Sequence, residues 1–392
     1  MSFAAALQPP ARVLLGPGPS MVHPRVLQAM STPLIGHLDP VYLRLMDETS
    51  RMLRATFRTR NNLTLPISAT GSAGMEACFV NLLEPGDEAI VCLNGVFGTR
   101  MADIVERCGA KAILVEAPWG EIVDASAVER AIAGARAPKL VAIVQAETST
   151  GIFQPLEEIG RIARDHGALL VVDAVTSLGG CPLDIDALQI DACYSGTQKC
   201  LSCPPGLAPL TFSDRALAVL RQRKTKVQSW YLDLTMIEKY WGSERVYHHT
   251  APISMSYALY EALRLVEEEG LEARWQRHQR HHLALKAGLE AMGLPLAAQP
   301  GHQLWTLNAV RIPDGVDDAT VRQALLTDYN IEIGGGLGPL KGKIWRIGLM
   351  GESSSAANVF LVLHALQQVL ARLGLPGEPG SGVAAAERYY AS

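Results

Sequence analysis

A lysine and an aspartate that each follow a short apolar run are the residues of this sequence best suited to chemistry. Asp173 ends the run Ala-Leu-Leu-Val-Val-Asp173, and Lys199 ends the segment Tyr194-Ser-Gly-Thr-Gln-Lys199. A lysine amine can form a Schiff base with an aldehyde, and burial or nearby cations lower its pKa toward neutrality. Each residue also has a structural alternative. Asp173 could cap a helix or pair with an internal arginine, and Lys199 could be a surface lysine.

A turn rich in glycine and hydroxyl groups supplies a third element. Ser68-Ala-Thr70-Gly71-Ser72-Ala-Gly74 leads into a helical pattern, as do the backbone nests that hold phosphate at helix N-termini. Alone, such a turn caps ordinary helices as often. Together, a phosphate cradle, a strand-end carboxylate and a lysine form the set that pyridoxal 5′-phosphate requires: the carboxylate keeps the pyridine nitrogen protonated, and the lysine binds the aldehyde.

Alternating short apolar runs and helical patterns position these residues. The pattern predicts strands over residues 88–93, 111–115, 140–145, 169–173, 192–195 and 207–212, with helices over 74–83, 99–107, 125–133 and 156–165. Such alternation is typical of an α/β fold with a mostly parallel sheet. Ligands collect at the carboxyl ends of strands in such sheets, where Asp173 and Lys199 are expected.

The pattern changes after the α/β region. A long helical stretch over 250–292 leads to strands at 306–312, 331–333 and 344–347 and helices at 318–329 and 356–373, which indicate a smaller α+β domain. We therefore expect an N-terminal arm (1–22), a large domain (23–265), a small C-terminal domain (266–375) and a flexible tail (376–392), the last because Pro376-Gly-Glu-Pro-Gly-Ser-Gly is rich in turn formers.

The sequence resembles the class V aminotransferases of fold type I, in particular those of the alanine:glyoxylate and serine:pyruvate kind. The resemblance spans most of the chain. It is carried by Leu14-Leu-Gly-Pro-Gly-Pro-Ser20, Val172-Asp-Ala-Val-Thr-Ser-Leu-Gly-Gly180, Tyr194-Ser-Gly-Thr-Gln-Lys199, Tyr247-His-His-Thr250 and Arg346-Ile-Gly-Leu-Met-Gly351. It implies a large α/β domain that binds pyridoxal 5′-phosphate and a smaller α+β domain.

The resemblance also implies roles for individual residues. Lys199 would be the Schiff-base lysine and proton shuttle, and Asp173 the partner of the pyridine nitrogen. Phe97 stands where the family usually stacks a tryptophan on the cofactor ring, and Arg346 would bind the substrate carboxylate. The remaining implied cofactor contacts are Thr70, Gly71, Ser72, Thr148 and Gln198.

Four further residues receive roles from the resemblance alone. Tyr247 and Thr250 match residues that reach the cofactor phosphate of the other subunit, which implies a homodimer with shared active sites. Gly18 and His37 match parts of the family fold that crowd the substrate.

The activity implied is ping-pong transfer of an amino group to glyoxylate. L-Alanine is the first expectation for the donor and L-serine the second; ureidoglycine is an alternative, and a lyase on the same scaffold is a more distant one. A non-catalytic binder of the cofactor is disfavoured because Lys199, Asp173 and Arg346 are all present.

Composition excludes other classes of function. Lys and Arg number 35 against 39 Asp and Glu, so no overall positive charge attracts nucleic acid or anionic lipid. Seven cysteines and an N-terminus without a secretory pattern lead us to expect a soluble cytoplasmic protein with no membrane partner. Cys200 and Cys203 have CxxC spacing, but no second pair accompanies them, so no metal site is expected.

Overall fold

A seven-stranded sheet forms the centre of the larger part of the molecule in the computed structural model, which describes residues 7–375 and 377–392. Six strands run parallel, and β10 is antiparallel to both of its neighbours. Residues 1–6 of the expected arm, and with them the start of the N-terminal segment judged for a secretory pattern, lie outside the described residues. The strand order across the sheet is β2 (Leu63–Ile67), β10 (Ala208–Phe212), β9 (Ala192–Tyr194), β8 (Leu169–Asp173), β5 (Pro138–Val144), β3 (Glu88–Leu93) and β4 (Lys111–Glu116).

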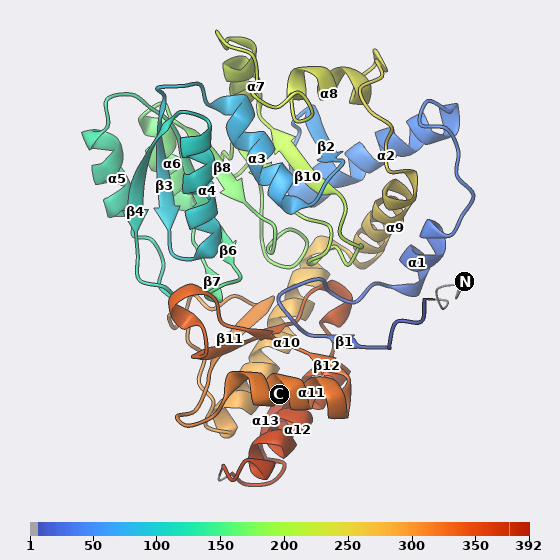
Figure 1. Cartoon of the computed structure of the whole chain (residues 1–392), viewed down its shortest axis with the longest axis vertical. Helices are drawn as coiled ribbons and strands as arrows, with labels where there is room; N and C mark the ends of the chain where they lie inside the picture. The colour runs from blue at the N-terminus through green and yellow to red at the C-terminus, as the bar shows by residue number, and fades with distance from the viewer. Residues whose placement is uncertain (1–6, 376) are drawn as a thin grey trace, which may run out of the picture.

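Helices cover both faces of this sheet (Figure 1). Strand β8 is buried along its whole length, and its side chains alternate: Leu170 and Val172 join the core on one face, and Leu169 and Val171 the core on the other. The first core is closed by α1 (Pro24–Met30), α2 (Pro40–Phe57), α5 (Ala125–Gly134), α6 (Glu157–Asp165) and α9 (Ile253–Glu269). The second is closed by α3 (Gly71–Leu82), α4 (Val96–Arg107), α7 (Asp214–Arg221) and α8 (Leu234–Trp241).

The stretch expected to form one long helix is two helices. Helix α9 ends at Gly270, whose φ of 81° breaks the helical path, and α10 (Leu271–Ala291) follows. Val266 still packs in the core of the larger part, so the expected boundary between 265 and 266 falls inside a helix of that part. Neither these helices nor any other in the described ranges is long and apolar enough to cross a membrane.

A second, smaller sheet lies beneath the first in Figure 1. It contains β11 (Leu307–Arg311), β14 (Ile344–Gly348) and β13 (Gly334–Gly335), all antiparallel, and packs with α10, α11 (Asp318–Tyr329) and α12 (Ala356–Arg372). The arm crosses to this part of the molecule, because β1 (Val13–Leu14) pairs in parallel with β12 (Ile331–Glu332). We refer to this smaller unit, including β1 and β12, as the small domain.

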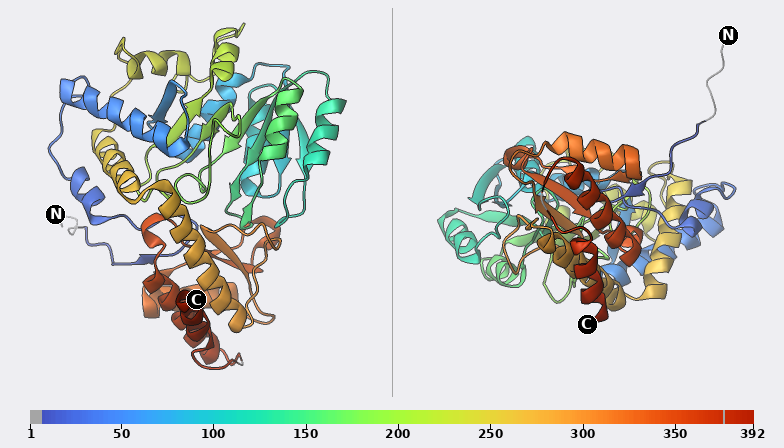
Figure 2. Two further views of the ribbon diagram at one scale, coloured as in Figure 1. Left: turned by 180° about the vertical axis from the view of Figure 1, so that it is seen from behind. Right: turned by 90° about the horizontal axis from the view of Figure 1, so that it is seen from below.

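The prediction of a flexible tail is wrong for most of residues 376–392. Ser381–Ala391 forms helix α13, which packs along α10, as the view from behind in Figure 2 shows. Ala386 is completely buried in the small-domain core. The turn formers mark only the connection before the helix, and Pro376 within it lies outside the described residues.

The contact between α10 and α13 gives a test of this docking. A methyl group at Gly288 would lie 2.4 Å from Cδ1 of Leu363 and 2.8 Å from the Gly382 carbonyl of α13. Gly288→Ala is therefore expected to lower the free energy of unfolding by about 1–3 kcal/mol. Gly134→Ala, in a helix with open space, is the control and should leave stability unchanged or slightly higher. Equal melting temperatures for the two variants would contradict the packing of α10 against α12 and α13.

Candidate active site

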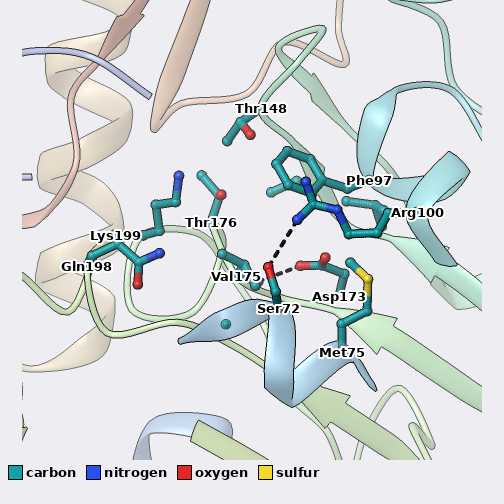
Figure 3. A pocket seen from close by; sticks show the side chains of 13 residues that line it. Ser72, Met75, Phe97, Arg100, Thr148, Asp173, Val175, Thr176, Gln198 and Lys199 are labelled. Carbon is teal, nitrogen blue, oxygen red and sulfur yellow. Dashed lines mark hydrogen bonds between the residues drawn. The ribbon is translucent and has the colours of Figure 1, made fainter. Parts of the chain in front are cut away.

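A cavity of about 250 Å³ opens where β5, β8 and β9 end. Asp173, at the end of β8, and Lys199, in the loop after β9, both line it, as Figure 3 shows. The structure therefore brings together the two residues that the sequence singled out. The other lining residues are Gly71, Ser72, Met75, Phe97, Arg100, Val144, Ala146, Thr148, Val175, Thr176 and Gln198.

Asp173 is a buried carboxylate held by hydrogen bonds. Its Oδ2 accepts a hydrogen bond from the Tyr194 hydroxyl at 2.7 Å, and its Oδ1 accepts one from the Val175 amide at 2.8 Å. Burial raises the pKa of Asp173 to about 6 despite these donors. No cation pairs directly with it among the described residues, so the carboxylate remains available for a positively charged group in the cavity. Tyr194 was missed as a site residue, although it begins the quoted lysine segment.

Lys199 is nearly buried, and its surroundings favour the neutral amine. Burial lowers its pKa to about 8, and the positive charge of Arg346 contributes to the shift. Its Nζ donates a hydrogen bond to the Pro17 carbonyl of the arm. With this pKa, about half of the amine is neutral at pH 8, and the neutral form can attack a carbonyl carbon and take up a proton.

The predicted anion cradle is the N-terminus of α3. Gly71 and Ser72 line the cavity there, and Thr70 is the N-cap residue but is not among the lining residues. A methyl group on Gly71 would lie 3.4 Å from Gly196 Cα and from Val175, so the start of α3 packs against the lysine segment. Gln198 lines the cavity as well, and its Nε2 is a further hydrogen-bond donor. Backbone amides and an amide side chain directed at one space suit an anionic group.

Of four further residues in or near the cavity lining, two were predicted from the sequence and two were missed. Phe97 and Thr148 line the cavity as expected. Arg100 was not predicted: its guanidinium lies 5.0 Å from the centre of the Phe97 ring and donates to the Ser72 hydroxyl at 3.0 Å. Glu147 was also missed. It is fully buried and accepts hydrogen bonds from the amide of Phe97 and from Ser149.

Arg346 lies on β14 of the small domain, beside the cavity rather than in its lining. Its Nε donates to the Gly335 carbonyl at 2.7 Å, and its Nη1 donates to the Thr148 carbonyl at 3.3 Å. Burial lowers the pKa of Arg346 from its usual value. The bond to Thr148 places a planar cation next to a residue that lines the cavity.

Three predicted residues lie in a separate cluster. Tyr247 is 57% exposed, its hydroxyl lies 3.5 Å from that of Thr250, and its ring lies 5.3 Å from that of His37. None of the three lines the cavity of the same chain. Gly18, in contrast, lies directly against Lys199.

Cys200 and Cys203 follow the lysine as buried free thiols. Burial raises the pKa of both thiols, which makes them poor nucleophiles. In the described ranges no group of three or more His, Cys, Asp or Glu side chains is arranged to hold a metal ion.

Comparisons with known proteins agree with this geometry. The sequence profile of the family described as Aminotransferase class-V matches residues 13–340. The crystal structure of an alanine–glyoxylate aminotransferase from Nostoc sp. superposes with a TM-score of 0.93 and 50% identity, covering 94% of this chain and 98% of that one. The ureidoglycine–glyoxylate aminotransferase of Bacillus subtilis superposes with a TM-score of 0.97 and 44% identity over 99% and 100% of the two chains.

A mammalian relative is also named as an alanine–glyoxylate aminotransferase. The alanine–glyoxylate aminotransferase of Rattus norvegicus is 41% identical over 94% of this chain and 90% of its own length. The prediction of fold type I from the sequence is thereby confirmed. A lysine and a carboxylate facing one cavity, on a chain that follows these enzymes almost from end to end, lead to one conclusion: the protein belongs to the class V aminotransferase family.

Proposed function

We propose that this protein transfers an amino group from a small amino acid, with L-alanine first and L-serine second, to glyoxylate, and that pyridoxal 5′-phosphate is its cofactor. The observation that carries the proposal is the meeting of Lys199 and Asp173 in one cavity between an anion cradle and an aromatic side chain. Class V aminotransferases of this fold depend on pyridoxal 5′-phosphate. The enzymes with glyoxylate in their names among the similar proteins support the acceptor.

The residues present fit this cofactor. Gly71 and Ser72 at the start of α3, together with the Nε2 donor of Gln198, would hold the phosphate. Thr70, the N-cap residue of α3, would contribute by shaping the turn that carries Gly71 and Ser72. Phe97 would stack on the ring, and Thr148 would donate a hydrogen bond near it. When bound, pyridoxal 5′-phosphate links to an amine through its aldehyde and withdraws electrons from the carbon bearing that amine.

Three residues of the protein would carry out the remaining roles. The carboxylate of Asp173 would keep a proton on the ring nitrogen, because its pKa of about 6 leaves it mostly ionised at neutral pH. The amine of Lys199 would take the α-proton of the substrate and return it to the cofactor side. Arg346 would orient the substrate by its carboxylate, which every amino acid and oxo acid substrate carries.

Two versions of this function differ in the amino donor. The likeness to the Bacillus subtilis ureidoglycine enzyme, over nearly the whole of both chains, favours (S)-ureidoglycine as a second candidate. We would measure kcat/KM for L-alanine, L-serine and ureidoglycine with glyoxylate as acceptor. The highest value for L-alanine is expected. A higher value for ureidoglycine would correct the donor, and no turnover with any of the three would overturn the proposal.

Removing the positive charge of Arg346 should weaken substrate binding. Arg346→Gln is expected to raise KM for the amino donor by about 10²-fold, because a neutral amide cannot form the bidentate ion pair. Arg311→Gln, on the neighbouring strand β11 with an exposed side chain, is the matched control and should leave KM unchanged. If Arg346→Gln lowered only the melting temperature, Arg346 would be a bridge between Gly335 and Thr148 and nothing more.

We further propose that the active form is a homodimer whose sites are shared. Tyr247 and Thr250 are exposed and absent from the cavity lining of their own chain, as residues that serve a partner would be. Apolar side chains around them are exposed as well: Leu34, Leu38, Trp230 and Val246. An exposed apolar surface of this kind is typical of an interface between subunits. His37, whose ring lies beside Tyr247, would reach the partner's substrate from the same surface.

Complementation between two damaged subunits tests the shared site. Lys199→Ala and the double variant Tyr247→Ala with Thr250→Ala should each be nearly inactive. Co-expressed, they should form heterodimers with about half of wild-type activity, because each heterodimer contains one intact site out of two. The measurement is activity per subunit after co-purification with two different tags. Activity no greater than the sum of the separate variants would contradict shared sites.

A further inference from the structure

The turn Pro17–Ser20 of the N-terminal arm contacts Lys199 at both ends of the residue. At the side-chain end, the Pro17 carbonyl accepts a hydrogen bond from Nζ. At the backbone end, the Ser20 hydroxyl donates to the Lys199 carbonyl at 2.7 Å, and the Ser20 amide donates to the Gln198 carbonyl at 2.9 Å. Ser20 is only 3% exposed, so these bonds are shielded from water. One short turn therefore fixes both the main chain and the amine of the lysine.

Glycine at position 18 is what allows this close approach. A methyl group there would lie 2.6 Å from Nζ of Lys199, 2.8 Å from Cδ and 2.9 Å from Cε. Gly18 also has a φ of 114°, which other residues rarely adopt. Any side chain at this position would push the lysine amine out of its present place, since the lysine chain is the flexible partner in the contact.

The same turn is attached to the small domain. Strand β1 immediately before it pairs with β12, and the Leu15 carbonyl accepts a hydrogen bond from the Gly348 amide at 2.8 Å. A methyl group on Gly334 of β13 would lie 2.6 Å from Pro17, so strand and turn touch. Strand β13 also pairs with β14, which carries Arg346. This close packing explains the glycine at position 334.

We propose that the Pro17–Ser20 turn is a positioning element for Lys199 and ties the lysine amine to the small domain that holds Arg346. The Pro17 carbonyl holds the amine, Gly18 leaves room for it, and Ser20 fixes the peptide that carries it. The position of the amine is thereby set by the same domain that would bind the substrate carboxylate. This inference rests on the proposed role of Lys199 toward pyridoxal 5′-phosphate.

Gly18→Ala is the first test, with two readouts. Adding pyridoxal 5′-phosphate to the cofactor-free protein and following the visible absorption band measures how fast Lys199 captures the aldehyde. Steady-state kinetics with L-alanine and glyoxylate measures kcat and KM. Both the capture rate and kcat are expected to fall about 10- to 100-fold, while KM changes little, because the displaced group is the amine and not the substrate-binding cation.

A matched control separates amine displacement from backbone strain. Gly315 also has a positive φ, of 80°, but open space around it, so Gly315→Ala introduces strain at a positive φ without the contact. Gly18→Ala equal to Gly315→Ala in capture rate and in kcat would overturn the proposal. If wild-type protein gave no visible band that depends on Lys199, the proposed function itself would fail and this inference with it.

Ser20→Ala provides a second route should Gly18→Ala fold poorly. It removes the hydrogen bond to the Lys199 carbonyl, and Ser256→Ala, which removes a buried hydrogen bond to Tyr42 outside the cavity lining, is its control. Ser20→Ala should slow capture several-fold, and Ser256→Ala should not. Equal capture rates for these two variants would also contradict a positioning role for the turn.

Discussion

Replacement of Lys199 with alanine should lower kcat/KM with L-alanine and glyoxylate by about 10⁴-fold or more, because the variant loses both the nucleophile and the proton carrier. The visible absorption band of the protein loaded with pyridoxal 5′-phosphate should disappear as well. Lys199 is the one lysine among the lining residues of the cavity, so no neighbouring lysine there can replace it. Absorption spectroscopy and a coupled assay of pyruvate formation measure the two effects.

An exposed lysine gives the control for this variant. The side chain of Lys111 is 69% exposed, and its Nζ lies 3.3 Å from Glu88. A surface ion pair of this kind contributes about 0–1 kcal/mol to stability, so Lys111→Ala should keep its spectrum and its activity. A visible band that persists in Lys199→Ala would show that another amine holds the cofactor, and the assignment of the site would be wrong.

Asp173→Asn should produce the second largest effect. The asparagine side chain keeps the size of aspartate; its Oδ1 can still accept from the Val175 amide and its Nδ2 can donate to the Tyr194 hydroxyl, but it cannot stabilise a positive charge on a ring nitrogen. We expect kcat to fall about 10²- to 10³-fold, the usual cost of removing one preorganised electrostatic contact. Retention of more than a tenth of the wild-type kcat would contradict the proposed role of Asp173.

In the cofactor-free protein, Asp173→Asn should leave the stability unchanged or raise it, although it lowers kcat. Burial raises the folded-state pKa of Asp173 from 3.8 to about 6, so the folded protein holds this proton more tightly than the unfolded chain. The ionised group therefore costs stability once the pH exceeds 3.8, and the cost is fully present above pH 6. Asp173→Asn removes this cost and should melt at the same or a higher temperature at neutral pH.

Asp191 is the matched control, because it is equally buried at the opposite edge of the sheet. It accepts hydrogen bonds from the Leu170 amide, the Ser213 hydroxyl and Arg215. Asp191→Asn should lower the free energy of unfolding by about 1–3 kcal/mol and leave kcat of the folded enzyme unchanged. The two variants thus distinguish a buried carboxylate that serves catalysis, Asp173, from one that stabilises the fold, Asp191.

The large domain could be predicted well from sequence because its buried strands have a clear pattern. The predicted strands 88–93 and 169–173 agree with β3 and β8 to the residue, and the other four predicted strands differ by two residues or fewer at each end. Strand β2 was missed, because Leu63–Ile67 is a short run that contains a proline and pairs only with β10 at the sheet edge. Helix α13 was missed since its stability comes from docking on α10, a contact between distant segments.

The candidate site was predictable where chemistry and position coincide in the sequence. Lys199 and Asp173 each end a strand-like segment, and so the sheet brings them together. Glu147 and Arg100 gave no such pattern: the burial of Glu147 and the position of Arg100 over Phe97 follow from tertiary packing alone. Tyr247, Thr250 and His37 could not be related to the cavity from one chain, because they lie on an exposed surface.

One spectrum tests the central claim most directly. Wild-type protein loaded with pyridoxal 5′-phosphate would be mixed with L-alanine in the absence of any oxo acid. The visible band should be replaced by the near-ultraviolet band of pyridoxamine 5′-phosphate as one pyruvate per site is released, and glyoxylate should then restore the visible band and release glycine. A visible band left unchanged by L-alanine, L-serine and ureidoglycine would contradict the account.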